Sequence, residues 1–118
     1  MEKPILIVDD NPNMASLLSE MLEVFHYKSV QAGDGKEALS KLGKQTFAMV
    51  ITDLRMPNMN GLELLKNIKG KHPKMPVVII SGYSASEFES DPDCPKPDGF
   101  LSKPFLMTDI ELLLEKLL

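Results

Sequence analysis

Three short runs of consecutive apolar residues place the strongest limit on what this chain can fold into. They cover Ile5–Val8, Phe47–Ile51 and Val77–Ile80, and each contains β-branched side chains. The runs are continuous rather than alternating, which is typical of strands that are buried on both faces. Two further short strands fit Lys28–Gln31 and Gly99–Ser102. We therefore expect a parallel sheet with helices packed on both sides.

Helical patterns fill the intervals between the predicted strands. Apolar residues recur at i, i+3 and i+4 in four segments: Met14–Phe25, Gly35–Leu42, Leu62–Ile68 and Ile110–Leu117. Residues that commonly cap helix N-termini precede them: Asn11, Asp34, Asn60 and Thr108, the last with Glu111 in a capping-box pattern. The alternation of strands and helices predicts one doubly wound α/β domain over residues 1–118.

Residues 85–99 interrupt this alternation. A fourth helix is expected between the fourth and fifth strands, but Pro92, Pro95 and Pro97 oppose it because proline cannot donate a helical hydrogen bond. We expect this helix to be short or missing and most of residues 85–98 to form a loop. The neighbouring flank of the sheet would then expose apolar surface, which usually finds a partner.

Composition excludes several classes of function. The formal charge is −4, with 13 basic and 17 acidic residues, so the chain lacks the charge signature of a protein that binds nucleic acid or an anionic membrane directly. Cys94 is the single cysteine, which excludes a disulfide framework and a CxxC motif. The N-terminus has no signal-peptide pattern, and the apolar runs are too short to cross a bilayer. A cytoplasmic location is the expectation.

Polar residues follow four of the predicted strands, and in a parallel sheet these positions meet at one edge. Asp9 and Asp10 follow the first strand, Asp53 the third, Ser81 the fourth and Lys103 the fifth. Three clustered carboxylates raise one another's pKa unless a cation neutralises them. A small number of oxygen ligands in an open loop setting favours Mg²⁺. The aspartates therefore predict a magnesium site.

This set of residues suits phosphoryl transfer. Asp53 can attack a phosphoryl group in line while Mg²⁺ and Lys103 stabilise charge on its equatorial oxygens, and the product is an acyl phosphate. Ser81 can donate a hydrogen bond to the new phosphoryl oxygen. Each residue alone has an ordinary explanation, such as a turn aspartate or a solvated lysine. Their shared placement after four different strands favours the functional explanation.

Four motifs occur in order along the chain: “ILIVDD”, “VITDLRMPNMNG”, “VIISGYS” and “FLSKPF”. In this combination the chain resembles the receiver domain of two-component response regulators over essentially its whole length. The resemblance implies a flavodoxin-like five-stranded sheet with strand order 2-1-3-4-5. It also implies that a histidine kinase or a phosphotransfer protein donates the phosphoryl group. The domain would then be a signalling switch that catalyses its own modification, and not an enzyme that turns over a substrate.

The resemblance assigns the central roles to matching positions. Asp53 resembles the phosphoacceptor of the family. Asp9 and Asp10 resemble its acidic pair, with Asp10 favoured as the direct Mg²⁺ ligand. Asp53 and the backbone carbonyl of Arg55 would complete the ligands that the protein supplies.

Residues of the last two strands would report phosphorylation. Ser81 resembles the switch hydroxyl, Lys103 the phosphate-contacting lysine, and Pro104 a proline whose preceding peptide bond is usually cis. Phe100 stands where the family has its rotating aromatic residue, and without a hydroxyl it can respond only by packing. In the family the fourth helix, fifth strand and fifth helix form the surface that changes, so we expect a homodimer or an effector there.

Two other functions stay open. One is a Mg²⁺-dependent phosphohydrolase with an aspartyl-phosphate intermediate. Against it, the nucleophile follows the third strand rather than the first, and the chain has no spare residues for a substrate-capping domain. The other is a protein-interaction module with a vestigial site, which the complete set of three aspartates, a serine and a lysine argues against. Turnover of small phosphate esters and binding of Mg²⁺ discriminate among the three.

Overall fold

Five parallel strands form the centre of the molecule, in the order β2-β1-β3-β4-β5. The structure, a computed structural model, describes residues 3–56, 59–82 and 95–118. The strands are β1 Ile5–Val8, β2 Ser29–Ala32, β3 Met49–Asp53, β4 Val77–Ser81 and β5 Gly99–Ser102. All five predicted strands are present, and the implied strand order is confirmed. The order reverses next to β1, so the chain winds outward in both directions from the centre of the sheet.

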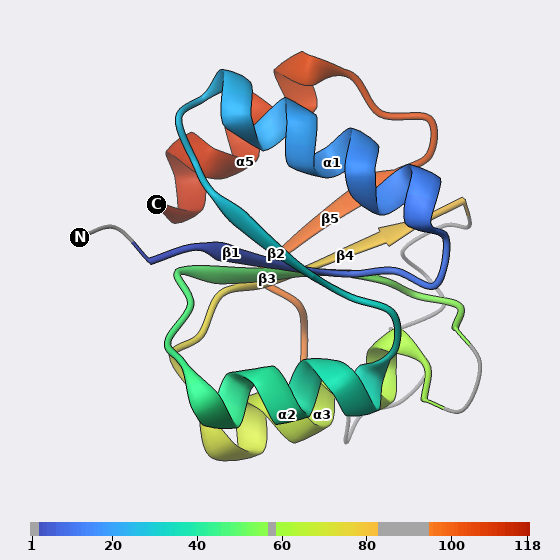
Figure 1. Cartoon of the computed structure of the whole chain (residues 1–118), viewed down its shortest axis with the longest axis vertical. Helices are drawn as coiled ribbons and strands as arrows, with labels where there is room; N and C mark the ends of the chain where they lie inside the picture. Colours follow the sequence, from blue (N-terminus) through green and yellow to red (C-terminus); the bar gives the residue numbers. More distant parts are fainter. Residues whose placement is uncertain (1–2, 57–58, 83–94) are drawn as a thin grey trace.

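Helices cover both faces of this sheet (Figure 1). The described residues contain α1 Pro12–Val24, α2 Gly35–Lys44, α3 Gly61–Lys71 and α5 Met107–Leu117. Helices α1 and α5 lie on one face, and α2 and α3 lie on the other. The doubly wound α/β architecture is therefore confirmed.

Two apolar cores explain why the strand sequences are continuous rather than alternating. Successive side chains of a strand point to opposite faces. In β1, Leu6 and Val8 pack into the core beneath α2 and α3, whereas Ile5 and Ile7 pack into the core beneath α1 and α5. All four side chains are at most 1% exposed, so polar residues have no place within this strand.

Side-chain caps set the start of three helices. Asn11 Oδ1 accepts hydrogen bonds from the backbone N–H groups of Asn13 and Met14, at 3.0 and 3.4 Å. Asp34 and Asn60 each accept the N–H of the residue three positions further on, at 2.7 and 2.9 Å. These oxygens satisfy donors that the first helical turn cannot pair internally. The predicted N-caps of α1, α2 and α3 are confirmed.

The predicted N-cap of the last helix is wrong. Helix α5 begins at Met107, so Thr108 lies inside its first turn and Leu106 is the cap. Leucine has no side-chain acceptor. Instead, Asp109 Oδ2 accepts the backbone N–H of Leu106 at 2.7 Å. The acidic partner of a capping box thus acts here without the usual serine or threonine, which lets the helix begin earlier than the pattern at Thr108 predicts.

The start of β5 is tied to α3 and β4 by an ion pair that the sequence pattern did not predict. Lys69 Nζ lies 2.6 Å from Asp98 Oδ2 and also donates to the carbonyl of Met75 at 2.8 Å. The same Asp98 oxygen accepts the N–H of Val77 at 2.9 Å. These contacts hold the segment before β5 against the first residue of β4 and align the two strands.

The prediction of a short or missing fourth helix concerns residues that are mostly outside the described ranges. Residues 83–94 are not described, and residues 95–98 contain neither helix nor strand. The prediction for residues 85–98 and the expected interface on that flank therefore stay predictions. Among the helices of the described ranges, none is both long and apolar enough to cross a bilayer.

Candidate functional site

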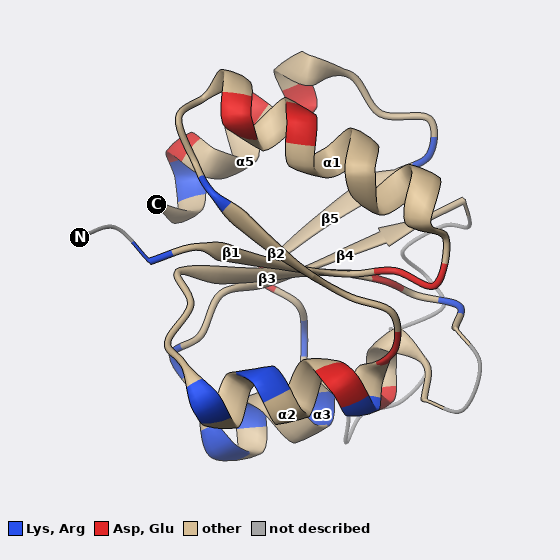
Figure 2. Ribbon diagram, viewed as in Figure 1, with Lys and Arg blue, Asp and Glu red and all other residues tan. Residues whose placement is uncertain are grey.

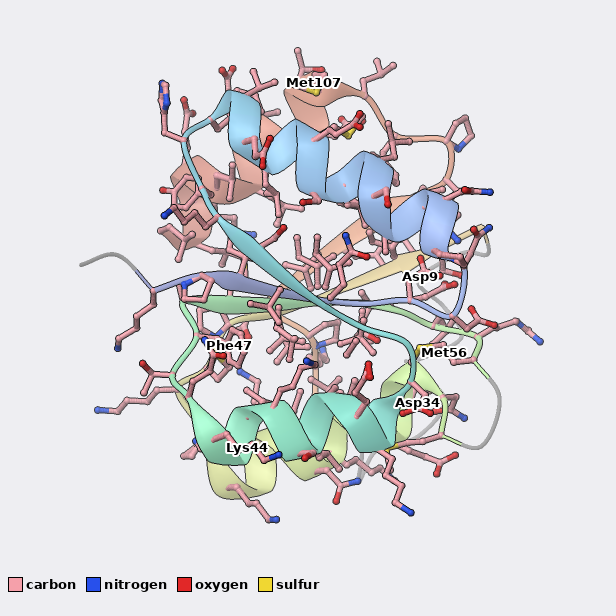
Figure 3. All side chains as sticks on the ribbon, in the orientation of Figure 1. Asp9, Asp34, Lys44, Phe47, Met56 and Met107 are labelled. Carbon is pink, nitrogen blue, oxygen red and sulfur yellow. The ribbon has the colours of Figure 1, made fainter. Side chains whose placement is uncertain are left out.

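Three carboxylates meet at the carboxyl edge of the sheet. Asp9 and Asp10 follow β1 directly, and Asp53 is the last residue of β3. The strands are in register with Val8 opposite Thr52, which places the next residue of each strand side by side. One carboxylate oxygen from each aspartate lies within 4.8 Å of the others. Figure 3 shows Asp9 at this edge of the sheet. The predicted acidic cluster therefore exists.

Asp9 is the buried member of the cluster. Its side chain is 4% exposed, and its Oδ1 accepts the N–H of Asn11 at 2.8 Å. Burial raises the pKa of Asp9, the charge of Asp53 adds to this increase, and the Asn11 hydrogen bond and Lys103 oppose it. Ionising Asp9 is therefore unfavourable until a cation compensates its charge.

The two oxygens of Asp53 have different partners. Oδ1 accepts the backbone N–H of Leu54 at 2.8 Å, and Oδ2 lies 3.4 Å from Lys103 Nζ. The Asp53 side chain is 12% exposed and that of Lys103 is 31% exposed, so the pair is accessible from solvent without being fully hydrated. The backbone bond orients the carboxylate and points Oδ2 toward the positively charged side of the site.

Pairing between β4 and β5 positions the other two predicted residues. Ser81 is the last residue of β4, is 2% exposed and lies opposite Ser102 of β5. The N–H of Lys103 donates to the carbonyl of Ser81 at 2.8 Å. The peptide bond between Lys103 and Pro104 is cis, as the resemblance implies. A displacement of β4 at Ser81 would therefore act directly on the backbone of Lys103.

Gly61 supports the site, and the sequence reasoning missed this role. A Cβ atom at this position would lie 2.6 Å from the carbonyl oxygen of Asp53 and 2.9 Å from the Cα atom of Leu54. The N–H of Gly61 also donates to the carbonyl of Leu54 at 2.7 Å. The loop from β3 thus folds back onto its own strand only because no side chain intervenes. The motif “MPNMNG” contains the signal, a glycine directly after the predicted cap Asn60, but only the approach of the loop to Asp53 shows why a residue without Cβ is needed there.

The chemistry of this cluster fits a hard divalent cation. The three donors are carboxylate oxygens, and a single lysine is paired with one of them. Mg²⁺ prefers such oxygen ligands and keeps several waters, which suits an edge that is open to solvent. The same arrangement offers a carboxylate nucleophile next to a cationic side chain, which is the combination that phosphoryl acceptance requires.

Comparison with known proteins agrees with this geometry. A family model described as the response regulator receiver domain matches residues 5–115. The chain belongs to this family. It is a receiver domain of the two-component response regulators, which work by phosphorylation-based signalling.

Relatives of this receiver domain differ in length. It is 32% identical over 116 residues to the response regulator receiver protein CpdR of Brucella abortus, covering 98% of this chain and 97% of CpdR. It is 33% identical over 114 residues to the transcriptional regulatory protein ZraR of Escherichia coli, covering 97% of this chain but 26% of ZraR. The receiver domain thus matches nearly the whole of one relative and about a quarter of the other.

The response regulator TrrA of Thermotoga maritima, solved in complex with Mg²⁺ and BeF, is similar in sequence and structure. Its TM-score against this receiver domain is 0.88 at 34% identity, and the alignment covers 98% of this chain and 99% of TrrA.

The two remaining predicted site residues, Arg55 and Phe100, lie on the loop after β3 and in β5. Arg55 is exposed on the loop that follows β3, two residues after Asp53. Phe100 lies in β5, partly buried, and packs against the core beneath α2 and α3. The metal-ligand role of the Arg55 carbonyl and the switching role of Phe100 stay predictions.

Proposed function

We propose that this receiver domain accepts a phosphoryl group on Asp53 from the phosphohistidine of a histidine kinase or a phosphotransfer protein. The observation that carries the proposal is that the two carboxylate oxygens of Asp53 have different partners. One carboxylate oxygen is held by the N–H of Leu54, and the other faces the ammonium group of Lys103. A carboxylate oriented in this way can attack phosphorus without first losing a full hydration shell.

In the proposed reaction an oxygen of Asp53 forms a bond to phosphorus while the phosphorus–nitrogen bond of the phosphohistidine breaks. The bonding electron pair stays on the imidazole nitrogen, and the product is an acyl phosphate. Lys103 stabilises the charge on the transferring group because its Nζ already lies beside Asp53. The Ser81 hydroxyl, at the end of the adjacent strand, would donate a hydrogen bond to a phosphoryl oxygen.

The residues that would hold Mg²⁺ are Asp9, Asp10, Asp53 and, through its backbone carbonyl, Arg55. When bound, the ion supplies positive charge that offsets both the clustered carboxylates and the incoming phosphoryl oxygens. The raised pKa of Asp9 supports this proposal, because burial makes its charge costly until a cation is present. The TrrA structure, which contains Mg²⁺ and BeF, supports it further.

The proposed output is a conformational change and not the release of a product. Ser81 and Phe100 lie on neighbouring strands, and the carbonyl of Ser81 is bonded to the N–H of Lys103. A hydroxyl that turns toward the phosphoryl group would therefore alter packing in β5. The partner surface that we propose, a homodimer or effector face beside β5 and α5, includes Leu106 and Leu112, which are 67% and 63% exposed.

The test is incubation with Mg²⁺ and a small phosphodonor, followed by intact mass. We expect one phosphoryl group on the wild-type protein and none on Asp53→Asn or in excess chelator. A phosphorylated kinase domain then serves as the donor in a second reaction.

An adduct that persists in Asp53→Asn contradicts the proposal. Sustained hydrolysis of a phosphate ester would indicate a phosphohydrolase, and failure to bind Mg²⁺ would indicate an interaction module.

A further inference from the structure

A hollow of about 650 Å³ lies at the opposite edge of the sheet from the aspartates. Leu42, Phe47 and Met75 form its apolar floor, between the ends of α2 and α3 and the beginning of β3. Lys3, His72 and Lys74 stand on its rim, and all three are exposed. Figure 3 shows Phe47 at one end of the sheet and Asp9 at the other.

The charge of this hollow is opposite to that of the chain. The chain has a formal charge of −4, yet none of the described residues that line the hollow is acidic. Lys44 and Lys71 add positive charge at the last residues of α2 and α3. Figure 2 shows lysines gathered at these two helix ends and acidic residues on the layer of α1 and α5.

Helix dipoles explain only part of this charge. Lysines in the last turn of a helix compensate the partial negative charge of its free carbonyl groups, and this accounts for Lys44 and Lys71. Lys3 precedes β1, and Lys74 lies beyond the end of α3, so neither belongs to a helix. Within the described ranges neither lysine has an ion-pair partner. Their charge is available to a ligand.

We propose that this hollow docks an acidic peptide segment of a partner protein, with one aromatic or large aliphatic side chain seated on the floor. Carboxylates of the segment would pair with Lys3 and Lys74, while its apolar side chain contacts Phe47 and Met75. The volume lies in the range of pockets that hold small-molecule ligands, so it has room for one such side chain and the residues beside it, and charge complementarity selects the acidic partner. The proposal stands independently of phosphorylation.

The position of the hollow allows peptide docking and phosphorylation of Asp53 to occur at the same time. Ala48 lines the hollow and directly precedes β3, and Asp53, the last residue of β3, is five residues further along the chain. At about 3.3 Å per residue the two sites are roughly 16 Å apart. A docked segment would therefore leave the phosphorylation site open to its phosphodonor. The partner protein could then stay bound at the hollow whether or not Asp53, at the other edge of the sheet, is phosphorylated.

The experiment titrates a fluorescein-labelled peptide of glutamates around a single phenylalanine into the protein at low ionic strength. We expect Lys3→Glu and Lys74→Glu each to weaken binding by roughly tenfold, since each replaces an attraction with a like-charge repulsion. The matched control is Lys116→Glu on α5, an exposed lysine on the opposite layer, which should bind as the wild type does. Replacing the phenylalanine of the peptide with glycine should also weaken binding.

Backbone amide NMR shifts locate the peptide, and the dispersion of the amide shifts of each variant without peptide provides a check on its fold. Shifts at Phe47, Ala48 and Met75 support the proposal. It is overturned if the peptide does not bind, if Lys116→Glu weakens binding as much as Lys74→Glu, or if shifts appear at the aspartates instead. Self-association that Lys74→Glu abolishes, without peptide binding, would assign the hollow to a second copy of the chain.

Discussion

Lys103 Nζ lies 3.4 Å from Asp53 Oδ2, although 50 residues separate them in the chain. The contact exists because β3 and β5 both end at the same edge of a parallel sheet, on either side of β4. It gives Asp53 a cationic neighbour from one side, while the acidic pair approaches from the other. The charge balance of the site depends on this long-range contact.

Removing that cation should slow phosphoryl transfer. We expect Lys103→Ala to reduce the rate of Asp53 phosphorylation by roughly 10²-fold, the usual effect of losing one donor to developing charge. Binding of Mg²⁺ should persist, because the lysine is not a ligand. The rate is measured by intact mass at fixed Mg²⁺ and phosphodonor. The control is Lys116→Ala on α5, and an equal loss in the control would contradict the assigned role.

Asp9 should make stability depend on pH in metal-free buffer. Because burial raises its pKa in the folded state, the folded protein retains a proton that the unfolded chain releases more readily. The free energy of unfolding contributed by Asp9 is therefore highest below the ordinary pKa of 3.8 and falls as the pH rises through the raised value. Asp9→Asn should unfold at a higher temperature than the wild type at pH 7, and the two should converge in acid.

Addition of Mg²⁺ at pH 7 should make the wild type unfold at a higher temperature than Asp9→Asn. Ligand binding stabilises the folded wild type by about 2.7 kcal/mol at a hundredfold excess over the dissociation constant. Asp9→Asn lacks one anionic group of the cluster and should gain less. Thermal unfolding with Mg²⁺ and with chelator measures both effects. If the wild type and the variant respond equally to Mg²⁺, then Asp9 is not part of the metal site.

A methyl group at position 61 should disturb both stability and function. Gly61→Ala would place Cβ 2.6 Å from the Asp53 carbonyl oxygen, so the β3–α3 loop must move away from the strand. We expect a loss of about 1–3 kcal/mol in the free energy of unfolding and slower phosphorylation, since Asp53 would shift. Denaturant unfolding and intact mass are the measurements.

The matched control is Gly43→Ala in α2, where an added Cβ meets nothing within 4 Å. This change should leave phosphorylation intact and stabilise the protein by up to about 1 kcal/mol, because alanine favours a helix. Equal destabilisation by both substitutions would mean that the close approach at Asp53 does not matter.

The ion pair between Lys69 and Asp98 should contribute to stability without affecting phosphorylation. The two side chains are 15% and 36% exposed, so solvent screens the pair only in part. We expect Lys69→Met to cost about 1 kcal/mol of unfolding free energy, since Asp98 keeps its bond from Val77. Lys71→Met, at an exposed position of the same helix, should be nearly neutral. A change in the phosphorylation rate would show that the pair also acts on the site.

Local physics made much of the fold predictable. An uninterrupted apolar strand such as Ile5–Val8 can exist only where both faces of a sheet are covered, so its sequence alone indicates the layers on either side. A cap such as Asn11 bonds to residues two and three positions away, so its pattern is also local. The prediction of Thr108 as the N-cap of α5 failed because Asp109 accepts the backbone N–H of Leu106 instead. The sequence pattern does not show which of two overlapping caps forms.

The sequence by itself determined the alternation of strands and helices, the two-sided burial of the sheet and the residue types that end each strand, because these follow from short-range periodicity and capping. Only the tertiary structure decided that the oxygens of Asp9, Asp10 and Asp53 lie within 4.8 Å of one another. It also decided which oxygen of Asp53 faces Lys103. The close approach of the Asp53 carbonyl oxygen to Gly61, which leaves no room for a Cβ atom, likewise depends on the tertiary structure. Distances between residues far apart in the chain depend on how strands pair and layers pack, and no single segment encodes them.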